Sequence, residues 1–351
     1  MKKSNVSLPL ADEKLLVIRI TALWALNEAG LGGMLHLVRS PFTGIFVGGT
    51  AVILVSLIGF FSSKPAASIL KSLVVVLLIK GIVSPQSPLP AYLAVSFQGV
   101  LGALLFQWIP SFRISAFVVG TLALLEAALQ KLLVLTILFG MPLWKSVNEF
   151  TDYVLKGLGL LGSATEGQGA LWLAGLYVGV YGIVGVLIGW LAGCFPAEVL
   201  AASQRLVLPE IGPAAGKPTA FSENKRRRFW QKPAFWWTMG TLFALMAIPF
   251  LIPGASQHFQ PVWLLARVLA VIGVWYFLLS PVLLYLLNRF LAKKMPRYQE
   301  EVEEALLLLP VLRTYLRAAW TETQSLKGVF RIKEWAVRVI AYALMHSSKI
   351  K

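Results

Sequence analysis

The sequence predicts an all-α membrane protein that crosses the bilayer several times. Of its 351 residues, 57% are apolar and only 14% are charged, whereas about 25% are charged in an ordinary soluble domain. The mean hydropathy is +0.73. Apolar stretches of about twenty residues recur along the chain, and this length crosses the roughly 30 Å of bilayer hydrocarbon. The composition therefore excludes a disordered chain and argues against a soluble enzyme.

We expect eight membrane spans. They cover residues 15–37, 43–61, 67–84, 89–109, 114–140, 170–195, 234–252 and 260–291. The third is short and the fifth and eighth are long, which favours tilted or kinked helices. The basic N-terminus leads into a long apolar segment without a small-residue cleavage site, so we expect a retained first span and not a signal peptide.

The basic residues predict the orientation of these spans. If the N-terminus is cytoplasmic, all but six of the 32 basic residues lie on the inner side, as the positive-inside rule requires. The six exceptions are Arg39, Lys80, Lys131, Lys145, Lys156 and Arg267. We therefore expect a multi-pass protein of the plasma (inner) membrane with both termini in the cytoplasm. The formal net charge of +16 then reflects topology and contact with lipid headgroups, and it implies no nucleic acid.

Composition divides the chain into four parts. A six-span membrane domain over 1–195 is followed by a basic cytoplasmic linker over 196–233, a two-span extension over 234–292 and a cytoplasmic amphipathic helical tail over 293–351. The tail fits either a helix that lies on the bilayer surface or a docking surface for a cytoplasmic partner. A kink is expected at Pro310.

Several motifs that known enzymes use in catalysis are missing from the sequence. The single cysteine, Cys194, allows neither an internal disulfide nor a cysteine metal cluster. The three histidines are far apart and form no HExxH motif, and no GxSxG motif occurs. The segment from Gly212 to Lys217 has the wrong spacing for a phosphate loop, and Pro218 stands where Ser or Thr is needed. We expect no enzyme, no catalytic residue, no metal and no cofactor, and any ATP hydrolysis would come from another chain.

Polar residues inside the spans predict a binding site. Glu28 and Glu126 are the only acidic residues well inside spans, and such costly groups usually face a cavity or a partner. At helical spacing, Trp24 and Asn27 share a face with Glu28. The predicted substrate-binding residues are Trp24, Asn27, Glu28, Gln98, Glu126, Gln130, Tyr177 and Tyr181. The alternative is that these side chains only form hydrogen bonds between helices.

Small residues mark two surfaces for close helix contact. Ala25, Ala29 and Gly33 stand at four-residue spacing on the opposite face of the first span, which permits close approach of another helix. This face either docks a separate protein or packs inside the bundle. In the sixth span, glycines at the same spacing predict close internal packing; they are Gly185, Gly189 and Gly193.

With these features, residues 15–195 resemble the S components of energy-coupling-factor (ECF) transporters, the substrate-binding membrane subunits of a class of ABC importers. Ala25-x-x-x-Ala29 matches the family's Ala-x-x-x-Ala motif, and the six-span layout with a long loop after the fifth span also matches. The resemblance implies capture of a vitamin-like organic solute, docking on a T component through Ala25, Ala29 and Gly33, and power from separate ABC-type ATPases. No histidine precedes His36, unlike the metal-importing relatives, which favours an organic solute.

The chain departs from the family in its two extra spans and tail, which lack the Ala-Arg-Ser/Gly-type tripeptide of T components. The extension is either a coupling element or an unrelated addition. Three other functions remain open: an ion-coupled secondary transporter that uses Glu28 and Glu126, a membrane enzyme acting on lipid substrates, and a non-catalytic scaffold or assembly subunit.

Overall fold

The computed structural model describes residues 13–32, 43–84, 87–159, 166–209, 237, 240–241 and 268–346. In these segments every regular element is a helix, as the sequence predicts, and no strand occurs. The helices are α1 (Glu13–Leu26), η1 (Asn27–Leu31), η2 (Gly44–Gly48), α3 (Gly49–Phe61), α4 (Pro65–Val83), α5 (Leu89–Trp108), α6 (Phe112–Phe139), α7 (Met141–Gly157), α8 (Gly169–Arg205), η4 (Val274–Leu279), α12 (Ser280–Glu322) and α13 (Gly328–Met345). Those labelled η are π-helical.

Five helical segments are long and apolar enough to cross a membrane. They are Gly44–Phe61, Pro65–Val83, Leu89–Trp108, Phe112–Phe139 and Gly169–Arg205, and they correspond to the second to sixth expected spans. Many large apolar side chains on α5, α6 and α8 are exposed, as lipid-facing residues are. The structure is thus compatible with an all-α membrane protein. Most of the expected seventh span, 234–252, lies outside the described residues, and the eighth is described from residue 268.

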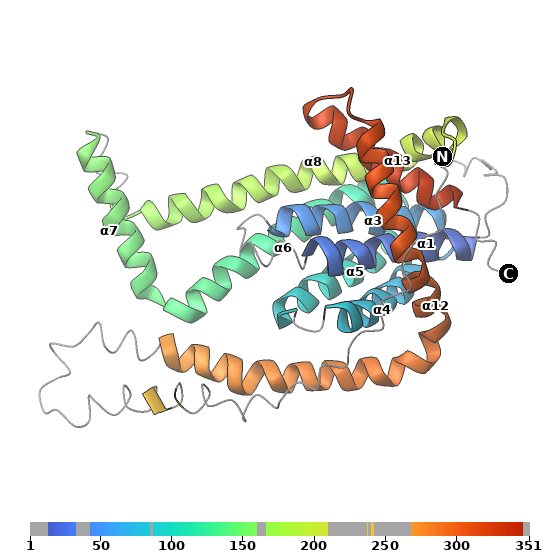
Figure 1. Cartoon of the computed structure of the whole chain (residues 1–351). Helices are drawn as coiled ribbons and strands as arrows, with labels where there is room; N and C mark the ends of the chain where they lie inside the picture. Colours follow the sequence, from blue (N-terminus) through green and yellow to red (C-terminus); the bar gives the residue numbers. More distant parts are fainter. Residues whose placement is uncertain are drawn as a thin grey trace, which may run out of the picture. The chain divides into compact units, whose positions relative to one another are not determined.

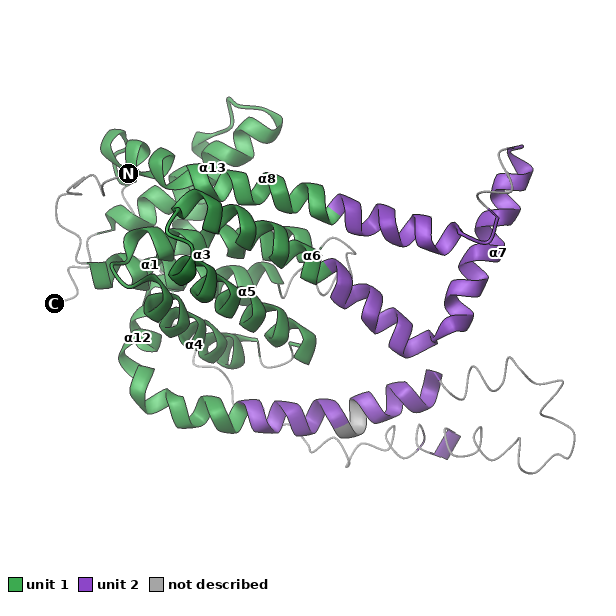
Figure 2. Ribbon diagram, turned by 180° about the vertical axis from the view of Figure 1, so that it is seen from behind, with its two compact units in different colours: residues 1–127, 181–219, 288–351 green, residues 128–180, 220–287 purple. Residues whose placement is uncertain are grey.

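The helices separate into two compact units, coloured in Figure 2. The first unit comprises residues 1–127, 181–219 and 288–351, and the second comprises 128–180 and 220–287. Three helices, α6, α8 and α12, each contribute residues to both units. The expected four-part division of the chain stays a prediction.

The first unit is built around a bundle in which α1 packs on α3 and α4, and α5 packs on both of these (Figure 1). Glycines allow the closest contacts. A Cβ on Gly102 of α5 would stand 2.5 Å from Val55 of α3, and one on Gly120 of α6 would stand 2.5 Å from the Cα of Gly189 on α8. Close packing through Gly185 and Gly189 confirms the contact predicted from their spacing.

The second unit contains α7, which follows Gly140, a glycine with a φ of 68° that permits the sharp turn after α6. The loop expected after the fifth span is therefore largely helical. Two α7 side chains hold the residues around the start of α8, since Asn148 Oδ1 accepts a hydrogen bond from the Ala170 N–H at 2.6 Å and the Asp152 carboxylate accepts one from the Gly167 N–H.

The C-terminal helices return to the bundle within the first unit. The backbone breaks at Tyr298, where φ is −117° and ψ is 15°, two residues after Pro296. Helix α12 continues through Pro310 without a break in its helical backbone, and the kink expected there stays a prediction. The part of α12 after the break and α13 form a helical hairpin, which we call the C-terminal hairpin. Its residues Tyr342 and Arg338 both bind the carboxylate of Glu322.

Candidate functional site

A buried ion pair lies inside the helical bundle of the first unit. Lys80 Nζ in the last turn of α4 is 2.7 Å from Glu28 Oε2 on η1, and each side chain is only 3% exposed. The Lys80 ammonium also lies 5.7 Å from the centre of the Tyr92 ring on α5. Removing two charges from water is costly, and it is offset only when the pair stays intact and further polar groups solvate it.

Two π-helical turns shape the backbone around this pair. In η1 the Gly32 N–H donates to the Asn27 carbonyl, five residues back, and such turns occur frequently at functional sites. Asn27 Nδ2 donates to the carbonyl of Val47 in η2 at 3.0 Å. The Asn27 side chain thus links the π-helical turn η1 to the π-helical turn η2.

Gln98 on α5 approaches the end of η2 directly. A Cβ on Gly48 would lie 3.0 Å from Gln98 Nε2, so glycine is what permits this approach. Gln98 Oε1 is buried and accepts no hydrogen bond. The Trp24 indole lies near the Glu28 carboxylate, but its N–H does not meet the geometry of a hydrogen bond. We call Trp24, Asn27, Glu28, Lys80, Tyr92 and Gln98 the polar cluster.

The polar cluster combines an anion, a cation, an aromatic face and an amide oxygen without a partner. Buried polar atoms are normally satisfied, whereas Gln98 Oε1 is buried without a hydrogen-bond partner and can accept a further hydrogen bond. These are the types of group that fix a small polar solute in an apolar site. Chemically, the cluster can exchange the Glu28–Lys80 contact for contacts with a solute or a proton.

The structure brings together four of the eight predicted substrate-binding residues: Trp24, Asn27, Glu28 and Gln98. Tyr181 is buried and its ring packs on Gly44, at the other end of η2, where Ala127 is also adjacent. Glu126 precedes Ala127 and has a buried Oε2 without a hydrogen bond.

Gln130 and Tyr177 belong to the second unit, so their part in the site stays a prediction.

Lys80 is not among the predicted site residues, because its position in the sequence bears first on the orientation of the spans. A lysine within an apolar run predicted to span the membrane requires an acidic neighbour or a water-filled cavity. With only two acidic residues well inside spans, that requirement pointed to Glu28 or Glu126. Which of the two it is depends on how the helices pack.

The structure describes two of the three predicted docking residues. Ala25 on α1 is fully buried and Ala29 on η1 is partly exposed, while Gly33 lies outside the described residues. Docking on a T component stays a prediction.

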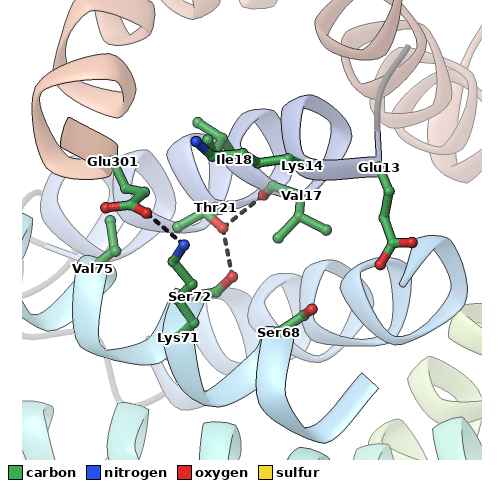
Figure 3. Close-up of a pocket in the computed structure, with 10 residues that line it drawn as sticks. All are labelled: Glu13, Lys14, Val17, Ile18, Thr21, Ser68, Lys71, Ser72, Val75 and Glu301. Atoms are coloured by element: carbon green, nitrogen blue, oxygen red, sulfur yellow. Dashed lines mark hydrogen bonds and ion pairs between the residues drawn. The ribbon is translucent and has the colours of Figure 1, made fainter. Parts of the chain in front are cut away.

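A cavity of about 340 Å³ lies at the opposite end of α1 (Figure 3). Its polar wall combines carboxylates, ammonium groups and hydroxyls. It is lined by Glu13, Lys14, Val17, Ile18, Thr21, Ser68, Lys71, Ser72, Val75 and Glu301.

Figure 3 shows that this cavity is where the C-terminal hairpin meets the bundle. Lys71 on α4 forms an ion pair of 2.5 Å with Glu301 on α12, and the hydroxyls of Thr21 and Ser72 are hydrogen bonded at 2.7 Å. Burial acts to raise the pKa of Glu301, but the hydrogen bond and charge of Lys71 outweigh it and lower that pKa below its ordinary value.

A further contact joins the hairpin to α1. Arg19 on α1 donates to the Leu344 carbonyl near the end of α13 at 2.5 Å. A cation at a helix C-terminus satisfies a free carbonyl and interacts favourably with the helix dipole. The tail expected at 293–351 is therefore attached to the first helix in this structure.

The described residues contain no group of three or more His, Cys, Asp or Glu positioned to hold a metal ion. Compared with protein-family models, with curated proteins and with solved structures, the chain matches none. The polar cluster and the cavity are therefore interpreted from their own chemistry.

Proposed function

We propose that this chain is the substrate-capturing membrane subunit of an ATP-driven importer for a vitamin-like organic solute, powered by separate ATPase subunits. The observation that supports this most is the polar cluster, with its buried ion pair and its unsatisfied amide oxygen among apolar helices. An ion pair that only holds helices together would not need the free hydrogen-bond acceptor Oε1 of Gln98 beside it. The resemblance to S components provides the importer class.

In this mechanism the solute enters the cluster and competes for the polar groups of Glu28, Lys80 and Gln98. Binding energy gained at these groups offsets the separation of the ion pair. ATP-dependent partners then favour a second conformation with weaker contacts to the solute, which releases it inside. Only a difference in affinity between the two conformations can couple ATP to transport.

The C-terminal hairpin is suited to pass on such a change, because Arg19 and Lys71 join it to α1 and α4. A partner that moves the hairpin would also move the helix that carries Glu28. We therefore propose a coupling role for the extension, which S components usually lack.

The first test is affinity purification from native membranes in a mild detergent, followed by mass spectrometry of co-purifying proteins. Recovery of a pair of ABC-type ATPases, with or without a separate T component, is the expected result. Absence of any ATPase under conditions that preserve other membrane complexes would overturn the importer proposal.

The second test asks whether the cluster is the solute site. Small molecules extracted from the purified wild type are compared with those from the Glu28→Gln/Lys80→Met double variant, which removes both charges. We expect a co-purifying solute to be lost in the double variant and retained in Glu301→Gln, a control that breaks an ion pair at the other end of the bundle. Equal recovery from all three proteins would remove the cluster from the proposal.

The buried ion pair also favours a second candidate, an ion-coupled secondary transporter. Protonation of Glu28 would release Lys80, and buried carboxylates commonly carry protons in such proteins. Proteoliposomes with an imposed proton or sodium gradient would distinguish the two candidates. Gradient-driven solute uptake without any ATPase would favour the ion-coupled transporter, and its absence together with ATPase recovery would favour the importer.

A further inference from the structure

The turn between α12 and α13 carries an unusual concentration of exposed apolar side chains. Val329 and Phe330 are 79% and 78% exposed, and Leu326 and Ile332 on either side of them are also exposed. Four large apolar side chains within seven residues form a patch that a water-facing helical turn does not normally carry. We call Leu326, Val329, Phe330 and Ile332 the turn patch.

Positive charge surrounds the turn patch. Residues 323–333 include Lys327, Arg331 and Lys333 and no acidic residue. The nearest acidic residues in the sequence, Glu322 and Glu334, are both paired with Arg338. The Arg331 guanidinium stacks on the Trp320 ring at 4.0 Å and so stays beside the apolar patch.

An ion pair joins α13 to α8 beside the patch. Lys333 Nζ on α13 is 2.8 Å from Glu198 Oε1 on α8. Glu198 is the first charged residue of α8 after a long apolar stretch, and charged residues are expected where a membrane helix leaves the hydrocarbon. Val329 and Phe330 lie about one helical turn from Lys333 along α13, so the patch is close to this charged part of α8. Figure 1 shows α13 crossing this end of α8.

We propose that the turn patch is a membrane-binding element that inserts into the headgroup region of an anionic phospholipid surface. Apolar side chains flanked by Lys and Arg are the composition that binds such surfaces, through apolar burial and attraction to anionic lipids. Gly328, with a φ of 60°, lets the chain reverse direction between α12 and α13. The hairpin is thereby held between the bundle at Arg19 and the lipid surface at its turn.

A fluorescence experiment in nanodiscs tests this proposal. Cys194 is replaced by alanine, Phe330→Cys is labelled with an environment-sensitive fluorophore, and the full-length protein is placed in phosphatidylcholine with or without phosphatidylglycerol. Spin-labelled lipid acyl chains serve as quenchers. We expect blue-shifted emission and quenching at least about twofold stronger with phosphatidylglycerol than without it.

Glu303→Cys is the matched control, because it is an exposed site on α12 within an acidic stretch. A label there should remain accessible to an aqueous quencher in both lipids. Lys327→Glu combined with Phe330→Cys should reduce the lipid quenching without unfolding the protein, since Lys327 is an exposed turn residue.

Three outcomes would overturn the proposal. A label at residue 330 that is quenched only from water shows that the patch does not contact lipid. Equal quenching in both lipid compositions removes the requirement for anionic lipid. A label that becomes shielded only when a co-purified protein is present assigns the patch to a protein partner. None of these results depends on solute transport, so the proposed function is tested separately.

Discussion

Two ion pairs in the first unit have the same chemistry and different surroundings. In Glu28–Lys80, at the irregular end of α1, both side chains are 3% exposed, whereas in Lys71–Glu301 the lysine is 43% exposed and the glutamate 11%. Lys71 and Lys80 are both on α4, and their spacing separates the two pairs by about 14 Å along that helix. Water therefore partly screens the outer pair, while the inner pair is shielded by the surrounding helices.

The surroundings decide what each ion pair can do. A pair with one half-exposed partner contributes less free energy and separates more easily than a fully buried one, which suits a contact between the bundle and the C-terminal hairpin. A buried pair is costly to break from one side, since the remaining charge has no solvent. It therefore holds a single arrangement until another polar group or a proton replaces one partner.

The largest expected effect comes from breaking the inner pair on one side. Lys80→Met leaves the Glu28 carboxylate buried and alone, and should lower the free energy of unfolding by about 3–5 kcal/mol. Thermal unfolding in nanodiscs measures this loss. The Glu28→Gln/Lys80→Met double variant should recover most of it, because neither charge remains. If the double variant is as unstable as Lys80→Met alone, the lost stability comes from the changed packing around the pair and not from the unpaired Glu28 charge.

An intermediate effect should follow from crowding the cluster without altering charge. Gly48→Ala places a methyl group 3.0 Å from Gln98 Nε2, and overpacking of this kind costs about 1–3 kcal/mol. Gly81→Ala is the control, since it follows Lys80 directly and its new methyl would meet nothing within 4 Å. The control should be neutral or slightly stabilising. Equal unfolding temperatures for the two variants would contradict close packing of Gln98 on η2.

A smaller effect is expected at the outer pair. Lys71→Met should cost about 1 kcal/mol, because the charge of the 43% exposed Lys71 is partly screened, whereas the Glu301 carboxylate that loses its partner is only 11% exposed. Added salt should reduce the difference from wild type further. A loss as large as that of Lys80→Met would mean that the hairpin holds the whole bundle together.

The smallest expected effect is a pH dependence of the stability that the Lys71–Glu301 ion pair contributes between the bundle and the C-terminal hairpin. Since the pKa of Glu301 is lowered in the folded protein, its contribution is fully present above the carboxylate's unfolded pKa and is lost as the pH falls through the folded value. The protection of α12 amides against hydrogen exchange, corrected for the slower intrinsic exchange in acid, should therefore fall as the pH is lowered. In Glu301→Gln this component should vanish, and a loss of protection that persists unchanged would assign it to another carboxylate.

Sequence patterns predicted the helices well, because apolar length and Pro or Gly boundaries act locally. The second to sixth expected spans correspond to described helices within a few residues at most ends, although α8 continues to Arg205. The backbone of α12 breaks at Tyr298, two residues after Pro296, and the kink expected at Pro310 stays a prediction.

The site was only partly predictable from sequence. Trp24, Asn27 and Glu28 share a helical face, so their grouping follows from periodicity. Glu28 and Lys80 are more than fifty positions apart in the sequence. The helical period relates residues within one helix, so it could not predict this contact between two helices. The π-helical turns at η1 and η2 change the register of the chain locally, which the 3.6-residue period does not anticipate.

By itself the sequence determined that this protein is helical and rich in apolar spans, and that Glu28 must face something other than lipid. These properties follow from the free-energy cost of placing polar groups in hydrocarbon. This cost depends on the composition of each segment and not on its neighbours. Only the tertiary structure decided that Lys80 is the partner, that Gln98 reaches η2 across Gly48, and that the C-terminal hairpin returns to Arg19. Those contacts depend on which helices become neighbours, and that choice is made by the packing of the whole bundle.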